Sequence, residues 1–129
     1  MLPSKNEGGF TIVELLVVIV VIAILVALTL PNIFGLQRRE RDETRKSDVR
    51  SIQKALEGYY QKSNAYPANL DSLVPDYLQA IPNNPQGDAY SYTGAECKQN
   101  KCQTYTLSAD LENSNDPVGD PYVIESVNQ

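Results

Sequence analysis

The chain has 129 residues and a formal charge of −5, with no His, no Trp and two Cys. Without His it cannot form a Ser-His-Asp triad or a His-containing zinc site, and two Cys cannot form a four-Cys metal site. The isoelectric point near 4.6 argues against a general nucleic-acid binder, which needs net positive charge. We find no nucleophile–base pair and expect no enzymatic activity.

Four segments of different composition follow one another. Residues 1–9 are polar and end in two glycines, and residues 10–30 are apolar apart from two Thr and one Glu. Residues 31–62 carry a net charge of +3, and residues 63–129 carry −7. We therefore divide the chain into a leader, an apolar segment, a basic stem and an acidic head.

The apolar segment is long enough to cross a membrane. Its 21 residues span roughly 31 Å as a helix, the thickness of a hydrocarbon core. A secretory signal peptide is one alternative, but the segment is long for one and no A-x-A-like cleavage site follows it. A plain membrane anchor is another. The positive-inside rule would then place the basic residues of 38–50 in the cytoplasm. This conflicts with a head outside the cytoplasm, which the two Cys of the head favour.

Glu14 is the acidic residue within the apolar segment. A carboxylate at mid-membrane costs about 2.5–3.5 kcal/mol and less near the interface. Because Glu14 lies four residues after Phe10, it could be an interfacial residue without a role. Alternatively, the carboxylate needs a cationic partner once water is removed. The segment has no basic side chain, but cleavage after Gly9 would create a free amine at Phe10.

Residues 9–14, Gly-Phe-Thr-Ile-Val-Glu, and the uninterrupted apolar run to Leu28 resemble the class III signal of type IV pilins and type II secretion pseudopilins. The resemblance is strong over residues 8–67. It implies that a prepilin peptidase cuts between Gly9 and Phe10 and methylates the new Phe10 nitrogen. It also implies that Glu14 pairs with the Phe10 amine of a neighbouring subunit during assembly.

The same resemblance implies a structural subunit of a type IV pilus-like filament that serves surface adhesion, twitching motility or DNA uptake. The chain would cross the cytoplasmic membrane once and then polymerise with itself into a helical surface filament. An inner-membrane assembly platform and its ATPase would be further partners. A type II secretion pseudopilin and a membrane-anchored monomeric adhesin are the alternatives. Nucleic-acid binding stays open, because the head is acidic and the stem is basic.

Two residues just beyond the apolar run predict a helix break. Pro31 cannot donate a hydrogen bond to the Ala27 carbonyl, and Gly35 costs roughly 1 kcal/mol relative to Ala. A simple kink, or the exit of the helix from lipid, is the alternative to a functional weak point. In the resembling filaments, the helix near this proline can melt and extend.

The spacing of the apolar residues in the stem predicts an amphipathic helix. Joined to the apolar segment, it would form one helix from Phe10 to Lys62. Apolar residues spaced +3, +4 and +3 form a single stripe, and i,i+4 charge pairs would add a few tenths of a kcal/mol each. The stripe is Val49, Ile52, Leu56 and Tyr59, and the pairs are Arg38–Asp42, Arg39–Glu43 and Asp42–Lys46.

The sequence of the head predicts a short helix and short strands, which need the stem to complete their hydrophobic core. Asn69 can cap a short helix from Leu70, and residues 89–93, 104–111 and 122–127 are typical of strands. The expected fold class is α+β: a long N-terminal helix, half transmembrane and half amphipathic, packed on a small antiparallel β-sheet.

Cys97 and Cys102 lie in a polar loop between the first two predicted strands. This spacing favours a small disulfide ring outside the cytoplasm. Two free thiols, or a metal held by the two Cys, are the alternatives.

The C-terminal region contains three carboxylates that could bind calcium: Asp110, Asp116 and Asp120. The spacing does not match an EF-hand. Major pseudopilins often have a calcium site in this part of the head, so the resemblance makes calcium the one cofactor to consider. A solvated acidic loop is the alternative.

Overall fold

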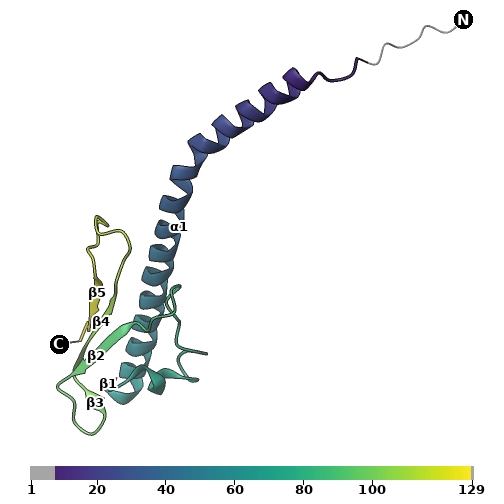
Figure 1. The fold of residues 1–129 in the computed structure, drawn as a ribbon. Helices are drawn as coiled ribbons and strands as arrows, with labels where there is room; N and C mark the ends of the chain where they lie inside the picture. Colours follow the sequence, from purple (N-terminus) through teal and green to yellow (C-terminus); the bar gives the residue numbers. More distant parts are fainter. Residues whose placement is uncertain (1–7, 129) are drawn as a thin grey trace, which may run out of the picture. The chain divides into compact units, whose positions relative to one another are not determined.

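The computed structural model describes residues 8–128, without the side chains of residues 31 and 32. Most of the predicted leader therefore lies outside the described residues. Two compact units are distinguished, one ending at Leu36 and the other beginning at Gln37. The α+β class is as predicted, and Figure 1 labels its elements. The elements are α1 (Ile12–Ser63), β1 (Tyr66–Pro67), η1 (Leu70–Leu73), β2 (Ser91–Ala95), β3 (Lys101–Cys102), β4 (Thr104–Ala109) and β5 (Tyr122–Glu125).

The first unit contains the apolar part of α1, and this part has no buried face. Every large apolar side chain described from Phe10 to Leu36 is at least 45% exposed. The helix is long and apolar enough to cross a membrane, with a mean hydropathy of 3.2 over its best window. Such a surface is unstable in water, so it requires lipid or other protein surfaces around it.

The helix does not end at the predicted weak point. α1 continues through Pro31 and Gly35 to Ser63, so neither residue terminates it in this structure. Proline removes one hydrogen bond from a helix, but its fixed φ is compatible with helical geometry. Local weakening at this place stays a prediction for the assembled filament, and the side chain of Pro31 lies outside the described residues.

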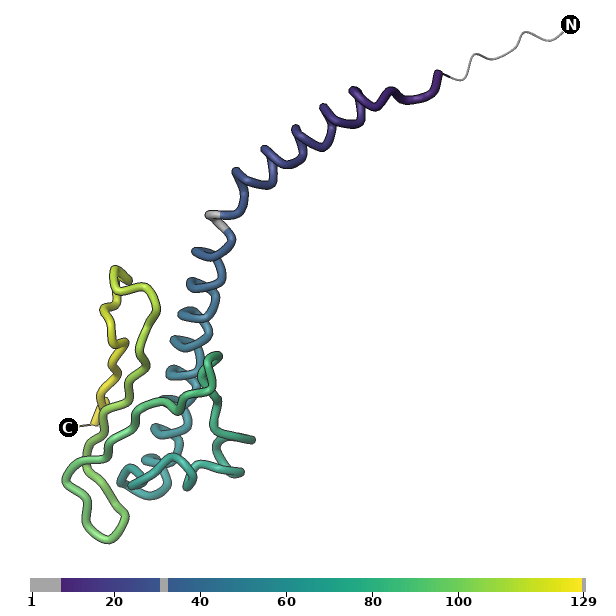
Figure 2. Tube along the Cα trace, in the orientation of Figure 1, coloured from purple at the N-terminus to yellow at the C-terminus, as the bar shows by residue number. Residues whose placement is uncertain are grey.

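The second unit is built on the apolar stripe of the stem. Val49, Ile52 and Leu56 are completely buried, as the spacing predicted. They pack with the inward face of β4, where Tyr105 and Leu107 are also buried. Figures 1 and 2 show β4 and β5 running beside this part of α1. Each large side chain buried in this way contributes roughly 1.5–3 kcal/mol, so the stem completes the core of the head.

The main sheet has three antiparallel strands in the order β2-β4-β5. Tyr92 of β2 and Ile124 of β5 both pair with Leu107, which places β4 in the centre. β2 begins at Ser91, two residues later than predicted. A second, two-stranded sheet pairs β1 with β3 and was not predicted, because strands of two residues carry no readable alternation.

Two Asn residues fix the ends of helical segments. Asn64 has a left-handed φ of 51°, and its N–H donates to the Tyr60 carbonyl at 2.7 Å, which ends α1. Asn69 caps η1 as predicted, because its side chain accepts a hydrogen bond from the Ser72 N–H at 3.3 Å. These caps turn the chain back from the stem into the head.

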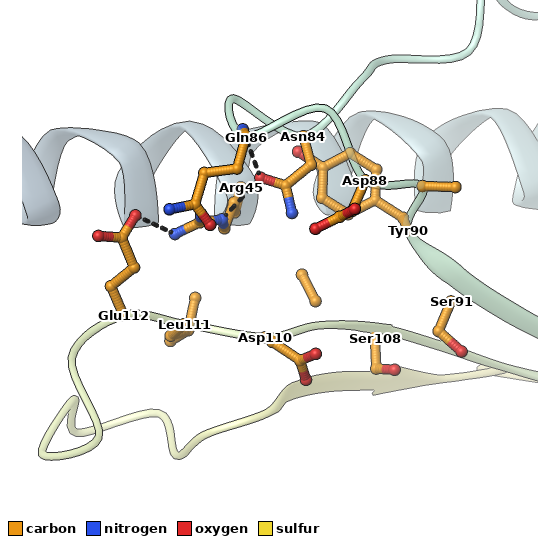
Figure 3. Close-up of a pocket in the computed structure, with 12 residues that line it drawn as sticks. Arg45, Asn84, Gln86, Asp88, Tyr90, Ser91, Ser108, Asp110, Leu111 and Glu112 are labelled. Atoms are coloured by element: carbon orange, nitrogen blue, oxygen red, sulfur yellow. Dashed lines mark hydrogen bonds and ion pairs between the residues drawn. The ribbon is translucent and has the colours of Figure 1, made fainter.

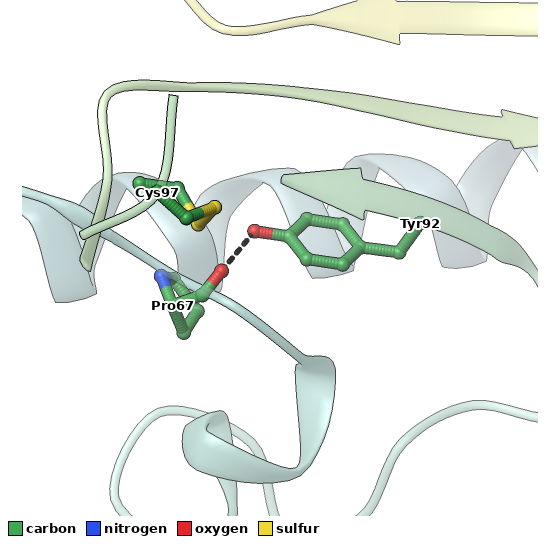
Figure 4. Close-up of a disulfide and its surroundings, with 4 residues drawn as sticks. Pro67, Tyr92 and Cys97 are labelled. Carbon is green, nitrogen blue, oxygen red and sulfur yellow. Dashed lines mark hydrogen bonds between the residues drawn. A yellow bond between two sulfur atoms is a disulfide. The ribbon is translucent and has the colours of Figure 1, made fainter. Parts of the chain in front are cut away.

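The predicted disulfide is present and joins Cys97 to Cys102 (Figure 4). Cys102 belongs to β3 and is fully buried. A Cβ atom added to Gly94 would lie 2.6 Å from the Cys102 sulfur, so the disulfide packs directly on the β2 backbone. Close by, the Tyr92 hydroxyl donates to the Pro67 carbonyl at 2.6 Å. The disulfide thus ties β3 to the segment that follows β2.

Candidate processing and assembly site

The Gly9–Phe10 bond lies directly before α1 and outside any regular element. Both residues are exposed, and the Phe10 side chain is 84% exposed. A peptidase needs backbone that is free of helical hydrogen bonds, and the helix begins only at Ile12. The geometry therefore permits cleavage at the predicted junction.

Thr11 caps the start of α1, a role that the sequence pattern did not predict. Its hydroxyl accepts a hydrogen bond from the Glu14 N–H at 3.2 Å, and its carbonyl accepts from the Leu15 N–H at 3.1 Å. Glu14 lies in the first turn, where a carboxylate interacts favourably with the positive end of the helix dipole. The helix thus starts with a capping residue two positions after the predicted cleavage point.

Glu14 is exposed and forms no salt bridge with any of residues 8–128. Its predicted pairing with the Phe10 amine of a neighbour concerns an assembled state and stays a prediction. The apolar side chains beside Glu14 are equally exposed. Any assembly that buries this helix therefore surrounds the carboxylate with apolar groups and makes a cationic partner necessary.

A buried ion pair fastens the stem to the C-terminal region. Asp42 and Arg45 have side chains only 1% exposed, and an Arg45 nitrogen lies 2.6 Å from Asp42 Oδ1. Asp42 also accepts hydrogen bonds from the backbone N–H groups of Glu112, at 2.9 Å, and Asn113, at 3.0 Å. These additional bonds compensate the carboxylate for its lost water.

Glu112 binds two arginines of the stem. Arg41 donates to both carboxylate oxygens, at 2.6 and 2.7 Å, and an Arg45 nitrogen lies 3.0 Å from Oε1. The hydrogen bond from Arg41, followed by that from Arg45, lowers the pKa of Glu112 to about 2. The stem cations therefore keep this carboxylate ionised in the folded head.

Lys46, the residue after Arg45 in α1, also binds the C-terminal region. Its ammonium group lies 2.6 Å from Asp116 Oδ2 and 3.1 Å from Glu43 Oε1. The hydrogen bond from Lys46 lowers the pKa of Asp116, and the bond to Asp116 raises the pKa of Lys46. The ionised carboxylate of Asp116 and the protonated ammonium group of Lys46 are therefore both favoured.

The predicted i,i+4 charge pairs of the stem are wrong. Asp42 pairs with Arg45 and Glu43 with Lys46, both at i,i+3. Within the described residues, Arg38 and Arg39 form no salt bridge. The reason is tertiary: the stem cations turn toward carboxylates about 70 positions later in the chain, a separation that no helical spacing rule covers. The opposite charges of stem and head were the only sequence signal of this contact.

The three calcium candidates do not converge on one site. Asp110 lines a pocket of about 230 Å³ together with Asp88 (Figure 3). Asp116 binds Lys46, and Asp120 accepts a hydrogen bond from the Leu111 N–H at 3.0 Å. In the part of the chain that the structure describes, no group of three or more His, Cys, Asp or Glu could hold a metal ion. The arrangement therefore does not fit the predicted calcium site.

The head should lose stability in acid because of these carboxylates. The folded-state pKa of Glu112 is depressed, so its contribution is present above its unfolded value of roughly 4.3 and is lost as the pH falls toward about 2. Thermal unfolding of the full chain in detergent, followed by circular dichroism, should give a melting temperature that falls across this window. Glu112→Gln should weaken the dependence, and the exposed control Glu125→Gln should not. An equal melting temperature above and below the window would contradict the expectation.

Comparison with known proteins gives the family. The model of the prokaryotic N-terminal methylation motif matches residues 4–30. The type II secretion system core protein G of Aeromonas hydrophila is 31% identical over 104 residues, which cover 67% of this chain and 73% of that protein. Its counterpart in Vibrio cholerae is 26% identical over 135 residues, 92% of each chain. The type IV wide pilus major component PilA4 of Thermus thermophilus is 35% identical over 80 residues, 62% of this chain and 61% of that protein. The chain belongs to the family of type IV pilins and type II secretion pseudopilins.

Proposed function

We propose that this chain is the structural subunit of a type IV pilus-like surface filament whose core is formed by the apolar part of α1. The proposal rests mainly on the first part of α1, residues 12–36. This part exposes its large apolar side chains and has Glu14 in its first turn. A helix of this kind needs lipid first and other copies of itself afterwards. The head, by contrast, buries its own core on the stem.

Processing precedes assembly in this proposal. A prepilin peptidase cleaves the exposed Gly9–Phe10 bond and methylates the new amine. The family relationship and the methylation motif at residues 4–30 support this step. The position of the bond, two residues before the start of α1, also supports it.

Before assembly, the processed chain is anchored in the cytoplasmic membrane by the apolar helix. An assembly platform of the inner membrane and its ATPase then extract it into the filament. The transfer exchanges lipid contacts for helix–helix contacts, so the apolar surface stays out of water throughout. During the transfer Glu14 pairs with the Phe10 amine of a neighbouring subunit, and each new subunit is thereby set in register.

A pseudopilus of a type II secretion system is the second candidate. It is supported by the core protein G of Vibrio cholerae, which aligns over 92% of this chain at 26% identity, while the pilus component of Thermus thermophilus aligns over 62% at 35% identity. Both candidates use the same processing and the same helical core. They differ in whether the filament extends from the cell surface.

Mass spectrometry and electron microscopy of sheared surface material test the proposal. We expect filaments whose subunit begins at an N-methylated Phe10, which leaves 120 of the 129 residues. Surface protein that still contains residues 1–9 would contradict the processing step. Cells that hold processed protein only in the membrane, and show no filaments until it is overproduced, would decide for the pseudopilus.

A further inference from the structure

The loop between β4 and β5, residues 110–121, is the segment in which the family resemblance implies a calcium ion. Calcium requires six to eight oxygen ligands around one point. The described residues offer no group of three acidic side chains there. Asp116, the candidate nearest the stem, already holds a cation that belongs to the chain itself.

We propose that the ammonium group of Lys46 takes the place of a metal ion in organising this loop. Lys46 projects from α1, and its nitrogen lies 2.6 Å from Asp116 Oδ2 and 3.1 Å from Glu43 Oε1. The side chains of Lys46 and Asp116 are only 8% and 11% exposed. A largely buried cation is thus held between two carboxylates.

Asp116 in turn shapes the loop. Its Oδ1 accepts a hydrogen bond from the Val118 N–H at 3.1 Å, and its carbonyl accepts from the Gly119 N–H at 3.0 Å. Its own N–H donates to the Asn113 carbonyl at 3.0 Å. One residue therefore closes two successive turns while its second carboxylate oxygen binds Lys46.

Two further carboxylates that contact this loop also accept hydrogen bonds from donors of the chain. Asp42 accepts the N–H groups of Glu112 and Asn113, and Asp120 accepts that of Leu111. The loop is therefore held in part by hydrogen bonds within the chain. We infer that the head folds independently of calcium, so that a supply of assembly-competent subunits does not depend on external calcium. This inference concerns folding and stands whether the filament is a pilus or a pseudopilus.

Thermal unfolding of the full-length chain in detergent micelles tests the proposal. The two conditions are an excess of EDTA and about 5 mM CaCl2, which exceeds the roughly 10⁻⁴–10⁻³ M dissociation constants of extracellular calcium modules. We expect the melting temperature of the wild type to differ by less than about 1 °C between them, since a ligand stabilises only a fold that binds it. A rise of more than about 3 °C with calcium would overturn the proposal.

Variants of the ion pair complete the test. Lys46→Met keeps much of the side-chain length and removes the charge, and we expect it to lower the melting temperature by about 5 °C or more in both conditions. Lys54→Met, at an exposed position on the same helix, is the matched control and should leave it unchanged. Equal melting temperatures for the two variants would overturn the proposal.

Asp116→Asn keeps the experiment decisive if the Lys46 variant does not fold. This change preserves the shape of the residue and its turn hydrogen bonds but removes the charge that Lys46 binds. We expect a smaller decrease in melting temperature, again the same with calcium and with EDTA. Because the measurement is made on isolated subunits, a failure to form filaments in cells does not affect it. An Asp116→Asn variant as stable as the wild type would show that the pair does not organise the loop.

Discussion

We expect the Glu14→Ala variant to enter the membrane normally but to yield about 100-fold less filament than the wild type, or none. The carboxylate costs about 2.5–3.5 kcal/mol at mid-membrane by insertion scales, so its removal does not hinder insertion. In the filament core, however, the Phe10 amine of a neighbour would lose its partner. One unpaired buried charge costs roughly 3–5 kcal/mol, which shifts an assembly equilibrium by at least two orders of magnitude.

The measurement compares the membrane pool with sheared filaments, and the mass of the subunit reports its processing. Glu14→Gln should be milder but still defective, because it keeps a hydrogen-bond acceptor and loses the charge. Thr29→Ala is a control in the same helix, since the Thr29 hydroxyl donates to the carbonyl of Val26 in its own helix. Wild-type filament yield from a correctly processed Glu14→Ala variant would mean that Glu14 is an interfacial residue without a role in assembly.

Periodicity predicted the parts of the fold that are governed by local rules. The stripe through Val49, Ile52 and Leu56 is buried, and the alternation in β4 places Tyr105 and Leu107 in the core. A helix without breaks over the apolar segment was readable from length alone, because no strand approaches that length. Capping by Asn69 was likewise a local feature of the sequence.

Such local rules do not predict contacts between segments that are distant in the sequence. The sheet of β1 and β3 pairs residues 66–67 with residues 101–102, which local spacing rules do not relate. Helical spacing predicted i,i+4 pairs among the stem charges. In the structure Arg41, Arg45 and Lys46 instead bind Glu112 and Asp116 of the C-terminal region. Net charge predicts attraction between stem and head but not which residues meet.

The three calcium candidates are directed apart for the same reason. Three Asp close together in the sequence suggest a common site, but the direction of each carboxylate is decided by the nearest donor. Asp116 binds Lys46 of the stem, and Asp120 binds the Leu111 backbone. A cluster in sequence becomes a cluster in space only when no closer partner competes for its members.

Arg45→Met in the stem should strongly destabilise the unit formed by stem and head. It leaves the carboxylate of Asp42, whose side chain is 1% exposed, without its charged partner. Breaking a buried pair from one side costs roughly 3–5 kcal/mol. In a unit of this size the melting temperature should fall by more than about 10 °C. Arg38→Met, at an exposed position that forms no salt bridge within the described residues, is the matched control.

The double variant Asp42→Asn/Arg45→Met separates charge from packing. The introduced amide keeps one oxygen, which can accept from the Glu112 N–H, and loses the second acceptor, which binds the Asn113 N–H in the wild type, while the buried charge disappears. If the unpaired carboxylate causes the loss, the double variant should be more stable than Arg45→Met alone, since an ion pair replaced as a whole costs less than a broken one. Circular dichroism melts of the full chain in detergent give the comparison. A double variant no more stable than the single one would place the cost in lost hydrogen bonds instead: those of Arg45 to Asn84 and Gln86, and that of the Asn113 N–H to residue 42.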